Sequence, residues 1–167
     1  MAKAITEAEI EQEALELLKT MGYTHLFGPD IASDGPNPQR TSYSEVALQE
    51  RLKDVIERLN PKAGRDACYE AARKLTAQTS PSVIESNERF HKMMTEGVPV
   101  ECKKDGRIIW ENLKVIDFDN PKNNDWVAVN QFTVEENGNN RRADIVLFVN
   151  GLPLVLMELK NLSLIHI

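Results

Sequence analysis

The stretch that decides the fold is residues 142–160, which read RADIVLFVNGLPLVLMELK. Two runs of strand length, residues 143–149 and 153–159, flank Asn150-Gly151, a dipeptide typical of tight β-hairpin turns. Both runs are apolar on both faces, which predicts central strands of a sheet. Each run also carries charge at an end, where burial is costly unless the charge is paired or binds a metal.

The charged residues of this hairpin are Asp144 and the tripeptide Glu158-Leu159-Lys160. Because side chains alternate along a strand, Glu158 and Lys160 share one face. A two-residue loop would pair Asp144 with Met157 and place Glu158 on the opposite face. A three-residue loop with a left-handed Gly151, or a bulge, would bring both carboxylates to one face. A functional interpretation therefore requires an odd-length loop or a bulge.

Two carboxylates on one face suit Mg²⁺, which binds one or two carboxylates and keeps waters and a phosphate oxygen as its other ligands. Such an ion polarises the phosphate and makes a bound water more acidic. A neighbouring lysine can stabilise the negative charge that develops. The pattern thus indicates phosphodiester hydrolysis, while the alternative that the charges only cap a strand end stays open.

Upstream of the hairpin the periodicity is helical. Thr6 and Glu9 form a capping box that starts a helix, and Gly22 ends it. A loop rich in glycine and proline follows at 28–41, and helical spacing then dominates residues 44–96. We therefore expect a helical insertion between the first helix and the strands.

From residue 98 onward, short apolar runs alternate with turn signals. The predicted strands cover residues 98–103, 107–117, 126–135, 143–149 and 153–159. The predicted fold class is α+β, a mostly antiparallel sheet flanked by helices, with the helical insertion at about 44–96 and core strands at about 98–160. A chain of 167 residues supports one core, so we expect a single domain over residues 1–167.

Composition excludes several classes of function. The net charge of −6 argues against a stand-alone nucleic-acid binder, although it allows a local DNA contact. Neither an apolar run of membrane-spanning length nor a signal peptide is present, so we expect a cytoplasmic protein without membrane contact. Cys68 and Cys102 form no C-x-x-C pair and the histidines are scattered, which argues against zinc.

Residues 130–161, NQFTVEENGNNRRADIVLFVNGLPLVLMELKN, resemble the N-terminal nuclease domain of the type I restriction enzyme R subunit (HsdR). The resemblance continues upstream through IDFDNPKNNDWVAVNQF, SNERFHKMMTEGV, RLNP and the opening EIEQEALELLKTMGY. It covers nearly the whole chain, and its densest part is the hairpin itself.

The resemblance implies a restriction-endonuclease-like (PD-(D/E)xK) fold, a mixed sheet flanked by helices. By position, Asp144 and Glu158 would bind the metal and Lys160 would be the catalytic lysine. A glutamate of the first helix would be a further metal ligand, with Glu11 as the first choice and Glu7 as the second. Weaker candidates for contact with DNA are Gln131, Arg141 and Arg142.

The implied function is a Mg²⁺-dependent endonuclease domain that cuts double-stranded DNA. It would work in an ATP-dependent complex with methylation (M) and specificity (S) subunits, with ATP used by a motor that this chain lacks. Alternatives are a non-catalytic docking or DNA-contact module of the same subunit, and a nuclease of this fold acting in repair or junction cleavage.

The chain departs from the family pattern at two places. Ala143 stands where the family has proline, a change that leaves Asp144 in place. The apolar residues 162–167, LSLIHI, differ from the helix with a Gln-x-x-x-Tyr motif that follows in the family, which indicates a truncated fragment whose activity alone is open. The recognition sequence and the oligomeric state do not follow from the sequence.

Overall fold

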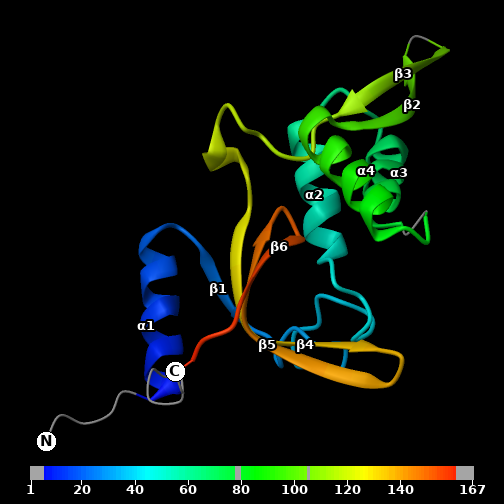
Figure 1. The fold of residues 1–167 in the computed structure, drawn as a ribbon. Coiled ribbons are helices and arrows are strands. Elements are labelled where there is room, and N and C mark those ends of the chain that lie inside the picture. Colours follow the sequence, from blue (N-terminus) through cyan, green and yellow to red (C-terminus); the bar gives the residue numbers. More distant parts are fainter. Residues whose placement is uncertain (1–5, 78–79, 105, 161–167) are drawn as a thin grey trace, which may run out of the picture. The chain divides into compact units, whose positions relative to one another are not determined.

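The computed structural model describes residues 6–77, 80–104 and 106–160, and the chain forms two compact units (Figure 1). The first, here called the sheet unit, combines Met1–Val46 with Trp126–Ile167. The second, the inserted unit, is Ala47–Asp125. The predicted difference of residues 162–167 from the family lies outside the described residues.

The sheet unit contains one helix and four strands. The helix is α1 (Glu7–Thr20), and the strands are β1 (Thr24–Phe27), β4 (Trp126–Glu136), β5 (Asn139–Val149) and β6 (Leu152–Met157). Their order in the sheet is β1-β4-β5-β6. β1 runs parallel to β4, and the other neighbours are antiparallel, so the sheet is mixed.

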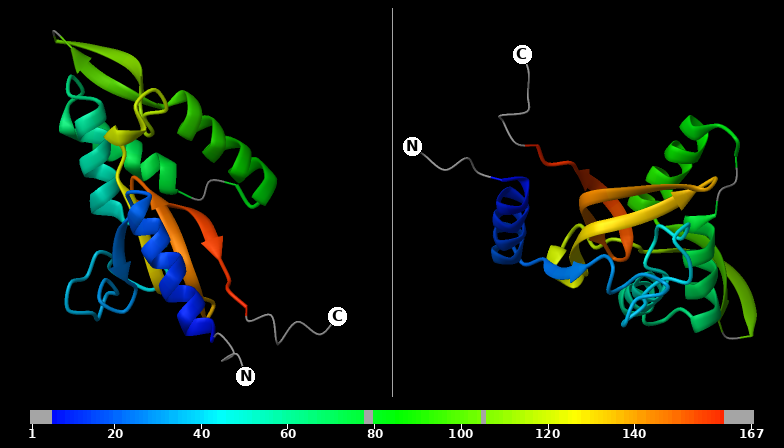
Figure 2. Two further views of the ribbon diagram at one scale, coloured as in Figure 1. Left: turned by 90° about the vertical axis from the view of Figure 1, so that its left-hand side faces the viewer. Right: turned by 90° about the horizontal axis from the view of Figure 1, so that it is seen from below.

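Helix α1 begins as the sequence predicts. The Thr6 backbone N–H donates to the Glu9 carboxylate at 2.8 Å, and the Glu9 backbone N–H donates to the Thr6 hydroxyl at 3.2 Å. The helix lies along one face of the sheet (Figure 2). Leu15 and Leu18 pack there in one cluster with Ala128 and Ile145 of the sheet.

The two strands of the decisive hairpin differ in their environment. β5 lies between β4 and β6 and is buried on both faces over most of its second half, which confirms it as a central strand. The prediction that the second strand is central is wrong. Among the described residues β6 pairs only with β5, and Val155 and Leu156 are 47% and 63% exposed. Pro153 was the available signal, since proline is confined to edge strands and bulges.

Strand β1 was not predicted. Four residues are too few to display a period, and the strand forms because Thr24–Phe27 pair with residues 127–130, about a hundred positions later in the chain. The Tyr23 ring next to it packs edge-on against Trp126 at 5.6 Å between ring centroids. The parallel pairing thus depends on contacts that no local pattern reveals.

The inserted unit holds the helical insertion and a separate hairpin. Its elements are α2 (Gln49–Leu59), α3 (Arg65–Thr76), α4 (Val83–Glu96), β2 (Val98–Lys104), β3 (Arg107–Leu113) and the short 3₁₀ helix η1 (Pro121–Asn123). The helical insertion expected from about residue 44 has its first helix only from Gln49, and the strand expected to reach residue 117 ends at Leu113. None of the helices described in either unit is long and apolar enough to cross a membrane.

The prediction that β2 and β3 belong to the core sheet is also wrong, because they form a two-stranded sheet of their own. Val98, Val100 and Cys102 are buried, whereas Pro99 and Glu101 between them are exposed. Such alternation is typical of a hairpin with one face covered, and β2 packs on α3 with that face. β5, which is buried on both faces, does not alternate in this way.

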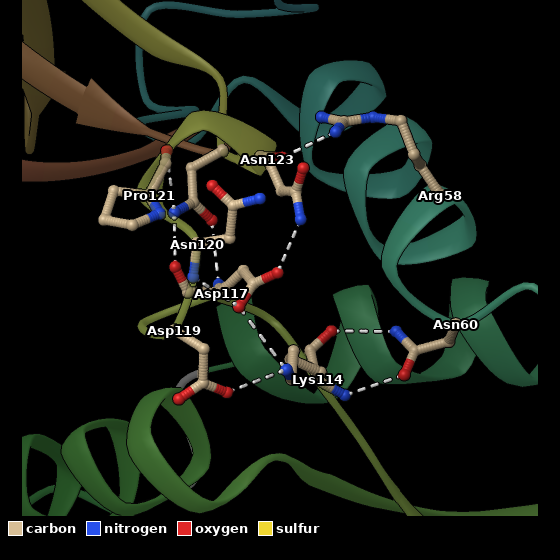
Figure 3. Close-up of polar contacts among 9 residues, drawn as sticks. Arg58, Asn60, Lys114, Asp117, Asp119, Asn120, Pro121 and Asn123 are labelled. Carbon is tan, nitrogen blue, oxygen red and sulfur yellow. Dashed lines mark hydrogen bonds and ion pairs between the residues drawn. The ribbon is translucent and has the colours of Figure 1, made fainter.

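A polar network organises the stretch after β3 (Figure 3). The Asn60 amide donates to the Lys114 carbonyl oxygen at 2.8 Å and accepts from the Lys114 backbone N–H at 2.9 Å. The Asp117 carboxylate accepts from the Asn123 amide at 2.8 Å and from the Asn120 backbone N–H at 3.2 Å. The segment after β3 forms no strand, so side chains take the place of a neighbouring strand as hydrogen-bond partners of its backbone groups.

Candidate functional site

The β5–β6 hairpin decides where the two candidate carboxylates lie. Its turn has two residues, Asn150 and Gly151, with φ angles of 55° and 81°, the positive values that type I′ turns require. Of the alternatives left open by the sequence, the three-residue loop is therefore excluded. A bulge restores the register instead, because Phe148 pairs with Pro153 while Leu147 pairs with Val155.

The bulge at Leu154 shifts the pairing by one residue. Ile145 is opposite Met157 in the last pair of the ladder, so Asp144 and Glu158 occupy the next opposed positions. Opposed residues of an antiparallel pair share a face. The functional interpretation required both carboxylates on one face of the sheet. A bulge in β6, and not the length of the turn, gives the register that meets this requirement.

Asp144 and the end of β6 are also joined directly. The Leu159 backbone N–H donates to Asp144 Oδ2 at 2.6 Å. Asp144 is half-buried, while Glu158 and Lys160 are exposed. Glu158 and Lys160 are therefore accessible just past the end of β6, next to Asp144 in the middle of β5.

The carboxylate oxygens of Asp144 and Glu158 fit a hard divalent cation. Carboxylate oxygens are the ligands that Mg²⁺ binds, and His25, a softer donor, is engaged with Asn130 at 2.8 Å. No group of three or more metal-binding side chains was found in the described ranges. Asp144 and Glu158 would thus hold an ion as a pair, with water and substrate oxygen completing its shell.

Glu11 of α1 contacts two consecutive residues of β4, Asn130 and Gln131. Glu11 Oε1 accepts from the Asn130 amide at 2.7 Å, and its Oε2 accepts from the Gln131 amide at 2.7 Å. Glu11 and Gln131 are candidates from the sequence, whereas Asn130 and His25 are not, because an asparagine and a histidine in an apolar strand carry no distinctive spacing. The roles predicted for Glu11 and Gln131 stay predictions.

The remaining candidates occupy other positions. Arg141 and Arg142 are exposed on β5 and pair with Val134 and Thr133 of β4. Arg142 is two residues from Asp144, so the alternation of the strand sets both on one face. Glu7, the second choice for a metal ligand, is exposed at the first position of α1. DNA contact by the arginines stays a prediction.

A mixed sheet in which Asp144 lies within β5, next to the end of β6 that Glu158 and Lys160 follow, defines an α+β domain with a candidate cation-binding site. The chain belongs to the family described as type I restriction enzyme R protein N terminus, whose sequence model matches residues 4–166.

Two curated relatives bear related names. The type I restriction enzyme HindI endonuclease subunit of Haemophilus influenzae is 34% identical over 158 residues, 94% of this chain and 15% of the relative. The putative type I restriction enzyme MjaIXP endonuclease subunit of Methanocaldococcus jannaschii is 31% identical over 163 residues, 96% of this chain and 16% of the relative. The chain thus spans only about a sixth of their length.

Proposed function

We propose that this chain is the Mg²⁺-dependent DNA-cleaving domain of a type I restriction endonuclease subunit. The observation that carries the proposal is the pairing of Ile145 with Met157, because the same register continued by one residue sets Asp144 opposite Glu158, with Lys160 two residues further along. The names of the relatives support an endonuclease subunit. The fold would be of the PD-(D/E)xK kind.

Asp144, Glu158 and Lys160 each have a distinct role in this proposal. Asp144 and Glu158 hold Mg²⁺, which supplies charge neutralisation on the scissile phosphate and a more acidic bound water. The Leu159 N–H holds one Asp144 oxygen, so Asp144 presents its other oxygen in a defined direction. Lys160 stabilises the negative charge that develops on the phosphate.

The assembly is part of the same proposal. The substrate is double-stranded DNA, and the complete subunit works with M and S subunits that select the site. ATP hydrolysis belongs to the part of the subunit outside this domain, since the relatives are about six times as long as their match to this chain. This division of labour accounts for a nuclease domain with a net charge of −6.

Alanine substitutions in the complete subunit test the proposal. Asp144→Ala and Lys160→Ala should each lower the rate of DNA cleavage by about 10² or more, because each removes a group that acts on transition-state charge, while the ATPase rate stays unchanged. Glu136→Ala, an exposed carboxylate at the hairpin tip of the same sheet, is the matched control. Parental cleavage by both active-site variants would refute the assignment. Loss of ATPase and cleavage together would favour a docking module.

A further inference from the structure

Strand β4 is irregular at the position beside Asp144. Asn130 pairs with Ile145 and Phe132 with Ala143, so Gln131 stands opposite Asp144, but it is left out of the ladder. Its φ angle is 54°, a left-handed conformation that non-glycine residues rarely adopt and that is strained. The register of β4 with β5 thus sets Gln131 opposite Asp144, and the register of β5 with β6, continued by one residue past Met157, sets Glu158 in the same row.

The strand pair bends strongly in this region. The Phe132 and Phe148 rings lie 5.3 Å apart between centroids, although Phe132 pairs with Ala143, five residues before Phe148. Five residues of straight strand would span roughly 16 Å. The left-handed residue Gln131 and the bend thus both lie at the position of β4 that is opposite Asp144 of β5.

The Glu11 carboxylate secures this conformation. It binds the amides of Asn130 and Gln131 with one oxygen each, both at 2.7 Å. Neighbouring side chains of a regular strand point to opposite faces. Both can reach one carboxylate here because the backbone turns at Gln131, so the bonds and the turn support each other.

Two further contacts surround the turn. The Gly28 N–H donates to the Asn130 carbonyl oxygen at 2.8 Å. The Asn130 amide nitrogen is used on Glu11, so its oxygen must accept from His25 Nε2, which lies 2.8 Å away and therefore carries the proton. Helix α1, β1 and β4 thus all contribute to the same small network.

We infer that Glu11 and Gln131 form a positioning pair, which holds β4 in its left-handed turn and thereby sets the place of Asp144. The inference rests on the proposed function only for its consequence in catalysis. Glu11 acts as an anchor for two amides and not as a metal ligand. Gln131 acts through the backbone beside Asp144 and not by contact with DNA.

The bond from the Leu159 N–H to Asp144 Oδ2 reports the place of Asp144 without metal or DNA. In the first experiment, amide hydrogen exchange is followed by NMR in Glu11→Gln and in Gln131→Gly, which keeps the left-handed backbone but removes the side chain. We expect Leu159 to exchange at least ten times faster in both variants, and Val146 within β5 to exchange as in the parent. Unchanged protection of Leu159 would overturn the inference.

A swap distinguishes an anchor from a metal ligand. Glu11→Gln combined with Gln131→Glu restores an amide–carboxylate bond with the partners exchanged, so Leu159 protection should return to within about threefold of the parent. Failure of the swap to recover any protection contradicts the pair. Gln12→Ala removes an amide–carboxylate bond to Glu16 on the same helix and should leave Leu159 unchanged.

A second measurement addresses the consequence for metal binding. Titration with Mn²⁺ alone should give a 10- to 100-fold weaker affinity for Glu11→Gln and Gln131→Gly, as is typical when residues that orient ligands are changed. The swap should recover it, whereas a ligand role for Glu11 predicts no recovery. If Asp144→Ala leaves Mn²⁺ binding unchanged, the proposed function fails, while the exchange experiment still decides the positioning pair.

Discussion

At the scale of single residues, Arg40 carries a charge that the sheet unit buries. Its guanidinium lies over the rings of Tyr43 and Phe132, at 4.9 and 4.2 Å from their centroids. The residue is 4% exposed, and its three side-chain nitrogens have no hydrogen-bond partner among the described residues. Burial lowers the pKa of Arg40 because it disfavours the charged form. Stacking on the rings opposes this cost.

Two substitutions separate the charge of Arg40 from its packing. A desolvated cation–π contact contributes about 2 kcal/mol to stability. Desolvation of a charge costs several kcal/mol, which is more than that contact returns. Arg40→Met keeps most of the volume, so its free energy of unfolding should equal or exceed that of the parent. Arg40→Ala leaves a cavity and should lose about 2 kcal/mol or more. Urea denaturation measures both, and an equal loss in the two variants would show that the charge itself stabilises the fold.

At the scale of elements, the junction of β1 with β4 depends on a close backbone approach. Gly28 follows β1 directly, and a Cβ atom there would meet the Gln131 carbonyl oxygen, with the Gln131 carbonyl carbon at 2.7 Å and the Asn130 oxygen at 2.8 Å. These are backbone atoms of a paired strand and cannot move aside alone. Only glycine therefore allows the parallel strands to meet here.

Gly28→Ala tests this junction. The strands must separate or the turn at Gln131 must shift, so the free energy of unfolding should fall by roughly 2 kcal/mol or more, within the range of overpacking effects. Gly64→Ala is the matched control, because Gly64 has open space around its Cβ position and a negative φ of −68°. Its loss should stay below about 1 kcal/mol. Thermal or urea unfolding gives both values, and equal losses would contradict the steric explanation.

The elements also show which local signals suffice. The capping box of α1 and the Asn150-Gly151 turn were predicted correctly because each depends on residues a few positions apart. The bulge at Leu154 was one of two open alternatives, because the apolar run 152–157 has no period that marks the extra residue. Both Asp144 and Glu158 were candidates from the sequence. Only the pairing of β5 with β6 in the structure, however, shows that their register sets them opposite each other.

At the scale of the whole molecule, the chain forms its sheet unit from two stretches that the inserted unit separates in sequence. The inserted unit has its own buried residues, among them Leu52, Ile56, Cys68 and Ala71. Its two cysteine thiols are neutral at ordinary pH, since burial raises the pKa of both Cys68 and Cys102. Asp117, by contrast, is buried as an anion in the network of Figure 3.

The loss of stability at acid pH should depend on Asp117. Hydrogen bonds from the Asn123 amide and the Asn120 N–H, together with Lys114 nearby, hold the pKa of Asp117 below its usual range. Its contribution is therefore present above about pH 4, the ordinary value of an aspartate, and is lost as the pH falls through the lowered folded-state pKa. Asp117→Asn should be less stable than the parent at pH 7, and the difference should shrink as the pH falls below 4.

Urea denaturation from pH 7 to pH 2.5 measures this difference. Asp119→Asn is the control, because the Asp119 side chain is 94% exposed and pairs only loosely with Lys114 at 3.7 Å. Its stability should follow that of the parent across the range. A gap between Asp117→Asn and the parent that stays constant from pH 7 to pH 2.5 would show that the carboxylate charge is not what stabilises the network.

The sequence by itself determined the first helix, the decisive hairpin, the acidic and basic residues that the hairpin carries, and the family, because all of these follow from short-range pattern or residue identity. Only the tertiary structure decided that β1 joins the sheet, that β2 and β3 leave it, that β6 is at its edge, and that Glu11 binds Asn130 and Gln131. The physical reason is distance along the chain. Strand pairing and carboxylate–amide bonds between residues more than a hundred positions apart depend on which surfaces meet after folding, and no local period records that choice.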